Sequence, residues 1–135
     1  MIAVRALDGT EVVVNEDAVT LVAGPYPHDL GPHTYVHGVD RGLLVTTEDT
    51  ATLVARLGVD PPLVKLTRPD RSPVWVKKSA VTEIRPPIPT EQPRGGAVKA
   101  VILLGELHQA VREDVQTATR LLTLRAPMSR YSTSA

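Results

Sequence analysis

The amino-acid sequence predicts a mainly β fold with short helices (α+β), built as a tandem duplication of a unit of about sixty residues. Two observations support this prediction: the kind of apolar residue in the chain, and a match between its two halves. Valine is the commonest of the 135 residues and Phe is absent. A core of β-branched side chains suits pleated strands better than helices.

The internal match runs through most of both halves, in two registers. From Ile2 to Val22 the chain matches Val64 to Ile84 at a constant offset of 62. Further along, Glu48-Asp49 matches Glu113-Asp114 at an offset of 65. The matched positions are Asp8 with Asp70, Thr10 with Ser72, Val12 and Val14 with Val74 and Val76, Ala18-Val19-Thr20 with Ala80-Val81-Thr82, Val36 with Val101, and Leu57 with Leu122. The change of offset predicts a three-residue insertion in the loop 86–96, where insertions are tolerated.

Each unit is predicted to contain about five strands followed by one helix. In the first unit, alternating apolar residues predict strands at 2–6, 11–14, 18–23, 34–39 and 43–46. The Asp8-Gly9 dipeptide is a favoured hairpin turn. Thr47-Glu48-Asp49 supplies an N-cap and early acids for a helix that ends at Leu57, before Gly58. The second unit repeats the pattern, with a helix at about 113–124.

The predicted organisation is an acidic unit at 1–60, a basic unit at 61–125 and a disordered tail at 126–135. Asp60-Pro61-Pro62 is a short, stiff linker, so the units are expected to sit in a fixed, pseudo-twofold relation. The patterns leave the topology open. Each unit could be a small five-stranded barrel resembling an SH3 or Sm-like fold, or the two units could share one sheet.

The string RALDGTEVVVNEDAVTLV resembles the opening of the small flagellar proteins FlbD and SwrD, and of uncharacterised bacteriophage proteins. The shared pattern is a strand, a turn, a second strand and an Asn-x-Asp/Glu segment; here it is carried by Leu7, Asp8, Gly9, Asn15 and Asp17. The resemblance covers about twenty residues of each unit. The second copy has an arginine where the first has the turn glycine. The resemblance implies a small β-rich accessory protein and brings no catalytic residues.

Catalytic and cofactor chemistry is not expected, and we predict that the protein is not an enzyme. The chain has no Cys, and it lacks a nucleophile elbow, a P-loop, a dinucleotide fingerprint and an H-E-x-x-H motif. His28, His33 and His37 suggest a metal site, but on a strand the last two would lie roughly 13 Å apart, too far for one ion. The recurring Asp8 and Asp70 fit a role in turns.

Trp75 is the only tryptophan, and it lies between Val74 and Val76. If the two valines face the core, Trp75 points to the opposite face of its strand. It then either covers the junction between the two units or anchors a subunit interface, where Trp is enriched.

Charge is distributed unevenly along the chain. Residues 1–60 contain three basic and nine acidic residues, a balance of −6, whereas residues 61–135 contain twelve basic and six acidic residues, a balance of +6. One hypothesis is head-to-tail self-association of acidic and basic units, which gives a ring or a filament. The alternatives are that the basic unit binds nucleic acid or another protein, or that the charges are only solvated. The interface candidates are Trp75, Lys65, Arg68, Arg71, Lys77, Lys78 and Arg85.

The sequence also favours a location. No signal peptide or membrane span is expected, because charge appears within five residues of the N-terminus and the longest apolar run is 100–104. The prediction is a cytoplasmic protein of a bacterial host or a virion-associated protein, with no membrane partner and no cofactor.

Overall fold

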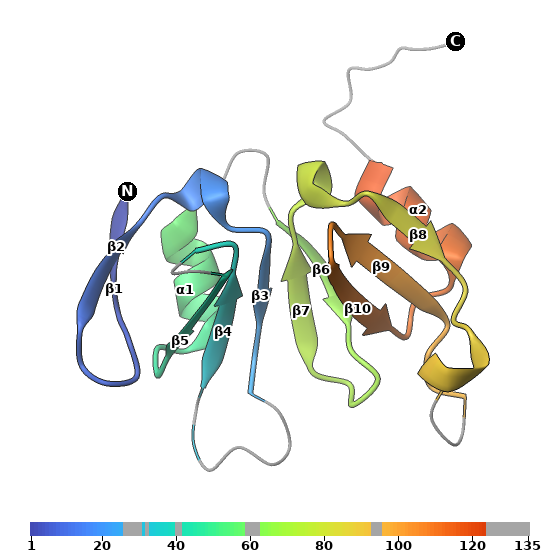
Figure 1. The fold of residues 1–135 in the computed structure, drawn as a ribbon, viewed down its shortest axis with the longest axis horizontal. Coiled ribbons are helices and arrows are strands. Elements are labelled where there is room, and N and C mark those ends of the chain that lie inside the picture. Colours follow the sequence, from blue (N-terminus) through green and yellow to red (C-terminus); the bar gives the residue numbers. More distant parts are fainter. Residues whose placement is uncertain (26–30, 32, 40–41, 59–62, 93–95, 124–135) are drawn as a thin grey trace, which may run out of the picture.

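The computed structural model describes residues 1–25, 31, 33–39, 42–58, 63–92 and 96–123. These residues form ten strands in three sheets, with two short α-helices (Figure 1). The prediction of a mainly β fold with short helices is therefore confirmed. The linker 60–62, the tail 126–135, His28 and part of the loop 86–96 lie outside the described residues.

In the described residues of the first half, the elements with given bounds are five strands, the 3₁₀ helix η1 and an α-helix. In order they are β1 (Ile2–Arg5), β2 (Glu11–Val14), η1 (Glu16–Ala18), β3 (Leu21–Ala23), β4 (Thr34–His37), β5 (Leu43–Thr46) and α1 (Thr50–Leu57). Strands were expected at all five places. The third is shorter than predicted, because the segment before it turns into η1, where the Asn15 side chain accepts a hydrogen bond from the Asp17 amide at 3.0 Å.

Among the described residues, the second half passes through the same order of strands and α-helix, with the 3₁₀ helix η4 between β8 and β9. They are β6 (Val64–Thr67), β7 (Pro73–Val76), η3 (Lys78–Ala80), β8 (Glu83–Arg85), η4 (Pro89–Glu91), β9 (Ala100–Leu104), β10 (Leu107–Val111) and α2 (Val115–Thr123). The extra helix, η4, falls in the loop that carries the expected insertion. The α2 helix begins two residues later than predicted, because Asp114 caps it by accepting a hydrogen bond from the Thr117 amide at 2.7 Å.

One sheet is shared between the two halves. Its strand order is β5-β4-β3-β7-β6, with every neighbouring pair antiparallel. The other sheets are the β1-β2 hairpin and the three-stranded β10-β9-β8. The sheets are not closed into barrels, so the SH3-like or Sm-like alternative is wrong. The halves share a sheet because β3 pairs with β7 on one side and with β4 on the other.

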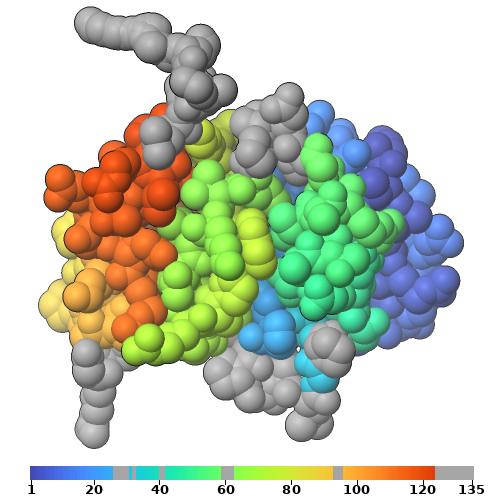
Figure 2. All heavy atoms as spheres, turned by 180° about the vertical axis from the view of Figure 1, so that it is seen from behind, coloured from blue at the N-terminus to red at the C-terminus, as the bar shows by residue number. Residues whose placement is uncertain are grey.

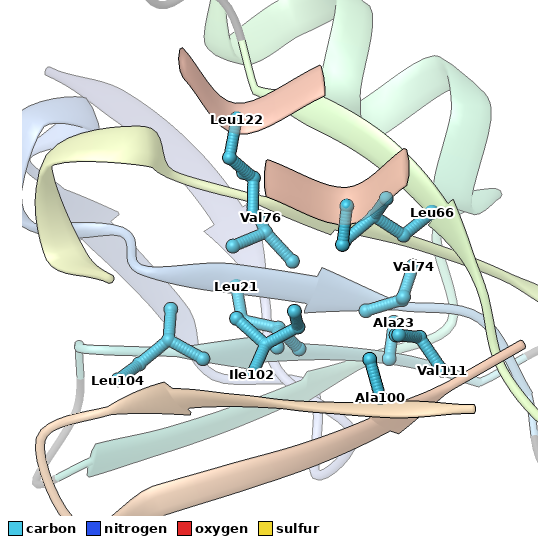
Figure 3. Close-up of a cluster of buried hydrophobic side chains, with 11 residues drawn as sticks. Leu21, Ala23, Leu66, Val74, Val76, Ala100, Ile102, Leu104, Val111 and Leu122 are labelled. Carbon is cyan, nitrogen blue, oxygen red and sulfur yellow. The ribbon is translucent and has the colours of Figure 1, made fainter. Parts of the chain in front are cut away.

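Two hydrophobic cores lie on either side of this shared sheet. The first-half core contains Val22, Leu44 and Leu53 together with residues of β1, β2 and β4. The second-half core contains Leu66, Ile102 and other residues of the second half, and it also takes in two residues of β3. In Figure 3 these two, Leu21 and Ala23, point into the cluster formed by Ala100, Ile102, Leu104, Val111 and Val76. Strand β3 therefore contributes side chains to both cores.

The two halves occupy opposite ends of the molecule. In the space-filling view the blue and teal atoms of the first half lie on one side, and the light-green to red atoms of the second half lie on the other (Figure 2). The β1-β2 hairpin lies at one end and β8 lies toward the other (Figure 1). The acidic first half and the basic second half are thus separated in space as well as in sequence.

The capping residues expected at the first α-helix are found in place. Asp49 accepts a hydrogen bond from the Thr52 amide at 3.1 Å, and Gly58 ends the helix in the left-handed conformation with φ 51°. Glu48 does not cap the helix and instead forms an ion pair with Arg56 at 2.5 Å. The acidic pair before this helix thus has a structural role.

The hairpin turns of β1-β2 and β6-β7 have the same geometry in both halves. Asp8 accepts a hydrogen bond from the Thr10 amide at 2.9 Å, and Asp70 accepts one from the Ser72 amide at 2.9 Å. These bonds lower the pKa of Asp8 below its usual value, with the Thr10 amide as the largest cause. The prediction that both aspartates stabilise turns is confirmed.

Replacement of Arg71 by Gly should stabilise the protein by about 1 kcal/mol. Arg71 has a φ of 73°, in the left-handed region that disfavours a side chain, and it is the counterpart of Gly9, whose φ is 92°. Urea unfolding of the variant measures the gain. The same change at the exposed Arg120, within α2, should be destabilising, because Gly weakens a helix. A loss of stability in Arg71→Gly would mean that the Arg71 side chain stabilises the turn by more than the strain costs.

Candidate interaction surfaces

The two halves of the molecule meet at a joint between β3 and β7. Strands β3 and β7 pair over three residues, with Leu21 opposite Val76, Val22 opposite Trp75 and Ala23 opposite Val74. Beyond the strands, the Lys77 amide donates to the Thr20 carbonyl at 2.9 Å. The Lys77 ammonium donates to the carbonyl oxygen of Asp17, in η1 of the first half.

Trp75 lies at this joint. Its neighbours Val74 and Val76 are buried in the second-half core, whereas Trp75 is half-buried against the first-half core, as the alternation predicted. Lys65, its partner across β6-β7, places its ammonium 5.7 Å from the centre of the ring, within the range of a cation–π contact. Of the two roles expected for Trp75, its position fits the one at the junction of the halves.

Arg68 is a buried residue, which the sequence did not indicate. Its side chain is only 2% exposed. The guanidinium donates to the Gly24 carbonyl at 3.0 Å, to the Pro25 carbonyl at 2.9 Å and to the Ser72 hydroxyl at 2.6 Å. Arg68 thus ties the second half to the end of β3, and its side chain is not available to a partner at the surface.

The remaining basic candidates do not form one surface with these residues. Arg85, on β8, makes two hydrogen bonds of 2.7 Å to Glu91 and through them lowers the pKa of that carboxyl group to about 2. Arg71 is exposed in the β6-β7 turn, and Lys78 lies in η3. The structure places Lys65 beside Trp75 and Lys77 at the joint. Arg71 and Arg85 lie on different elements, Arg71 in the turn between β6 and β7 and Arg85 on β8.

Two strand edges were missed in the sequence. Among the described residues, β2 pairs only with β1, and β8 pairs only with β9. Each therefore presents one unpaired edge, of the kind that pairs readily with another strand. Val13 on β2 is 64% exposed, and it is the one valine among the exposed large hydrophobic residues of the described segments. The match of Val13 with Trp75 was a signal that this position corresponds to the joint.

The described residues offer little support for a metal or catalytic site. No group of three or more His, Asp or Glu side chains within them could hold a metal ion. His37 is half-buried, and burial lowers its pKa. An open depression of about 200 Å³ is lined by Ala3, Arg5, Glu11, Glu48 and Arg56. Its volume is below the range of roughly 300–1,000 Å³ typical of small-molecule sites.

Comparison of the chain with protein-family models, with curated proteins and with solved structures gave no match. The resemblance to FlbD and SwrD is therefore still a prediction. Neither described α-helix has the length and apolar character needed to cross a membrane.

Proposed function

We propose that this protein is a non-enzymatic structural protein whose copies associate head to tail. The observation that carries the proposal is the separation of charge between the two halves, which lie at opposite ends of the molecule (Figure 2). Among the described residues, the first half has two basic and six acidic residues, a balance of −4, and the second half has nine basic and six acidic residues, a balance of +3. An acidic end can attract the basic end of another copy, and such a heterologous contact builds a ring or a filament. The proposal includes a bacterial or bacteriophage origin, with the protein in the host cytoplasm or in the virion.

Tandem duplication is part of the proposal. Support comes from the bounds of the elements: β1, β2 and β3 fall on β6, β7 and β8 at the offset of 62, residue by residue. The α1 helix falls on α2 at the offset of 65, with one further residue at the end of α2. The matched turns around Asp8 and Asp70 add a shared detail of geometry. A duplicated chain presents two similar units per copy, which suits a ring of pseudo-equivalent units.

Light scattering at two salt concentrations tests self-association. The protein should give a discrete mass of several copies at low salt. In about 1 M NaCl, where the Debye length falls to roughly 3 Å, the mass should decrease because the attraction between the ends is screened. An oligomer insensitive to salt would move the interface to apolar surface, and a monomer at both concentrations would overturn the proposed function.

Nucleic-acid binding by the basic half is the second candidate, and the excess of twelve basic over six acidic residues in 61–135 favours it. Within the described residues, however, Arg68 is buried, Arg85 is paired with Glu91 and Lys77 donates to the first half. Charge reversal of Lys78 separates the candidates. It should lower the mass at low salt if copies associate, and it should lower retention of a DNA oligonucleotide if the protein binds nucleic acid.

A further inference from the structure

The joint inside the chain pairs two strands that each have a counterpart in the other half of the sequence. At the offset of 62, β7 corresponds to β2, and β3 corresponds to β8. Inside the chain, β3 of the first half meets β7 of the second. The corresponding strands β8 and β2 are not paired with each other: in the described part of the chain, each has one open edge. The molecule therefore contains one completed joint and the two separate halves of another.

Figure 1 shows that the two open strands lie far apart in one copy. The β1-β2 hairpin forms one end of the molecule, and β2 pairs with β1. Strand β8 is the outer strand of the β10-β9-β8 sheet toward the other end. A single copy cannot bring these two edges together without unfolding, so a pairing between them requires a second molecule.

Building on the proposed self-association, we infer that β8 of one copy pairs antiparallel with β2 of the next. The register follows from the internal joint. Because Val22 lies opposite Trp75, Ile84 lies opposite Val13 of the next copy. By the same offset, Glu83 lies opposite Val14 and Arg85 lies opposite Val12. The partner is a second copy of this chain, and the contact is heterologous.

The side chains on the two edges suit this pairing. Val13 is 64% exposed in the single copy, and Ile84 is half-buried against the second-half core, so both would lose apolar surface to water on pairing. Inside the chain, η1 lies beside Lys77. Between copies, the corresponding contact places η3, with Lys78, beside the acidic η1 of the next copy.

Charge also distinguishes this pairing from its symmetric alternatives. A β2 edge facing another β2 edge would bring together Glu11, Glu16 and Asp17 of both copies. The two joints should also differ in strength. At the corresponding positions of the two strands, β3 has the fully buried Leu21 and Ala23, whereas β8 has the charged Glu83 and Arg85. The joint inside the chain is therefore apolar, and the joint between copies is more polar, so we expect it to be reversible and sensitive to salt.

Cysteine cross-linking tests the register, because the natural chain has no Cys. Chains carrying Val13→Cys and chains carrying Ile84→Cys are mixed in about 1 M NaCl, dialysed to low salt and oxidised. Paired residues place their Cα atoms within the roughly 4.4–6.8 Å that a disulfide spans. The mixture should give a disulfide-linked dimer in several-fold excess over either variant alone. A mixture of Ile84→Cys with Leu43→Cys, an exposed residue on β5, is the matched control.

The outcomes separate this inference from the proposed function. An oligomer by light scattering that gives no more cross-link between Val13→Cys and Ile84→Cys than the control would overturn the strand pairing and leave self-association standing. A dominant dimer of Val13→Cys with itself would replace the heterologous contact by a symmetric one. A wild-type monomer at low salt would remove both proposals. Thermal unfolding of each variant shows that it is folded before it is oxidised.

Discussion

Replacement of Leu21 by Ala is expected to lower the free energy of unfolding by about 2–5 kcal/mol. Leu21 is fully buried, and although it lies in the first half it packs in the second-half core. Its truncation leaves a cavity between β3 and residues such as Ile102, and the surrounding strands can close it only partly. Urea unfolding followed by circular dichroism measures the loss. Fluorescence of Trp75, the only Trp, reports the joint in the same experiment.

Leu43→Ala is the matched control for this prediction. Leu43 is also a leucine on a strand of the shared sheet, but it is 43% exposed, so its truncation should cost under about 1 kcal/mol. In Leu21→Ala the two spectroscopic signals should still change together, because the halves share β3. Equal losses in the two variants would contradict the assignment of Leu21 to a core that spans the joint.

Arg68→Met should cost about 2–4 kcal/mol of stability. The methionine keeps an apolar stem but donates no hydrogen bonds, so the carbonyls of Gly24 and Pro25 lose the guanidinium that now bonds them. Arg68→Lys should recover only part of the loss, because an ammonium group lacks the planar guanidinium whose Nη2 donates to both carbonyls while its Nε donates to the Ser72 hydroxyl. Urea unfolding of the wild type, Arg68→Met and Arg68→Lys measures the free energy of unfolding of each protein.

Arg71→Ala is the control, since Arg71 is exposed in the same hairpin. At its φ of 73° an alanine is strained as much as the arginine, so the backbone strain is the same before and after the change. We expect a change below about 0.5 kcal/mol for this variant. If Arg68→Met were as stable as the wild type and lost affinity for a DNA oligonucleotide, Arg68 would be a surface contact and its assignment to the joint would be wrong.

Sequence reasoning located the elements well, because local rules determine them. The turn at Asp8, the cap at Asp49 and the glycine at the end of α1 each act within a few residues. The partnership of β3 with β7 could not be predicted in this way. It joins residues far apart in the chain, and their apolar patterns are compatible with either a closed barrel in each unit or a shared sheet.

The candidate site was predicted less completely than the fold. Charge counts identified a basic half, but they could not distinguish an arginine in solvent from one enclosed by backbone carbonyls, as Arg68 is. A better signal was present at the matched positions. Leu21 and Ala23 correspond to Glu83 and Arg85, so one member of the strand pair has an apolar pattern and the other has charges. That contrast indicates which strand is covered within the chain and which one is at an edge.

The double role of β3 also has a consequence for synthesis of the chain on the ribosome. Leu21 and Ala23 leave the ribosome long before the strands that cover them, β7 and β9. At roughly 5–20 residues per second, the apolar face of β3 waits several seconds for its partners. During that interval the nascent chain resembles an aggregation-prone intermediate with an uncovered strand. Folding of the first half is therefore completed only after most of the second half has been translated.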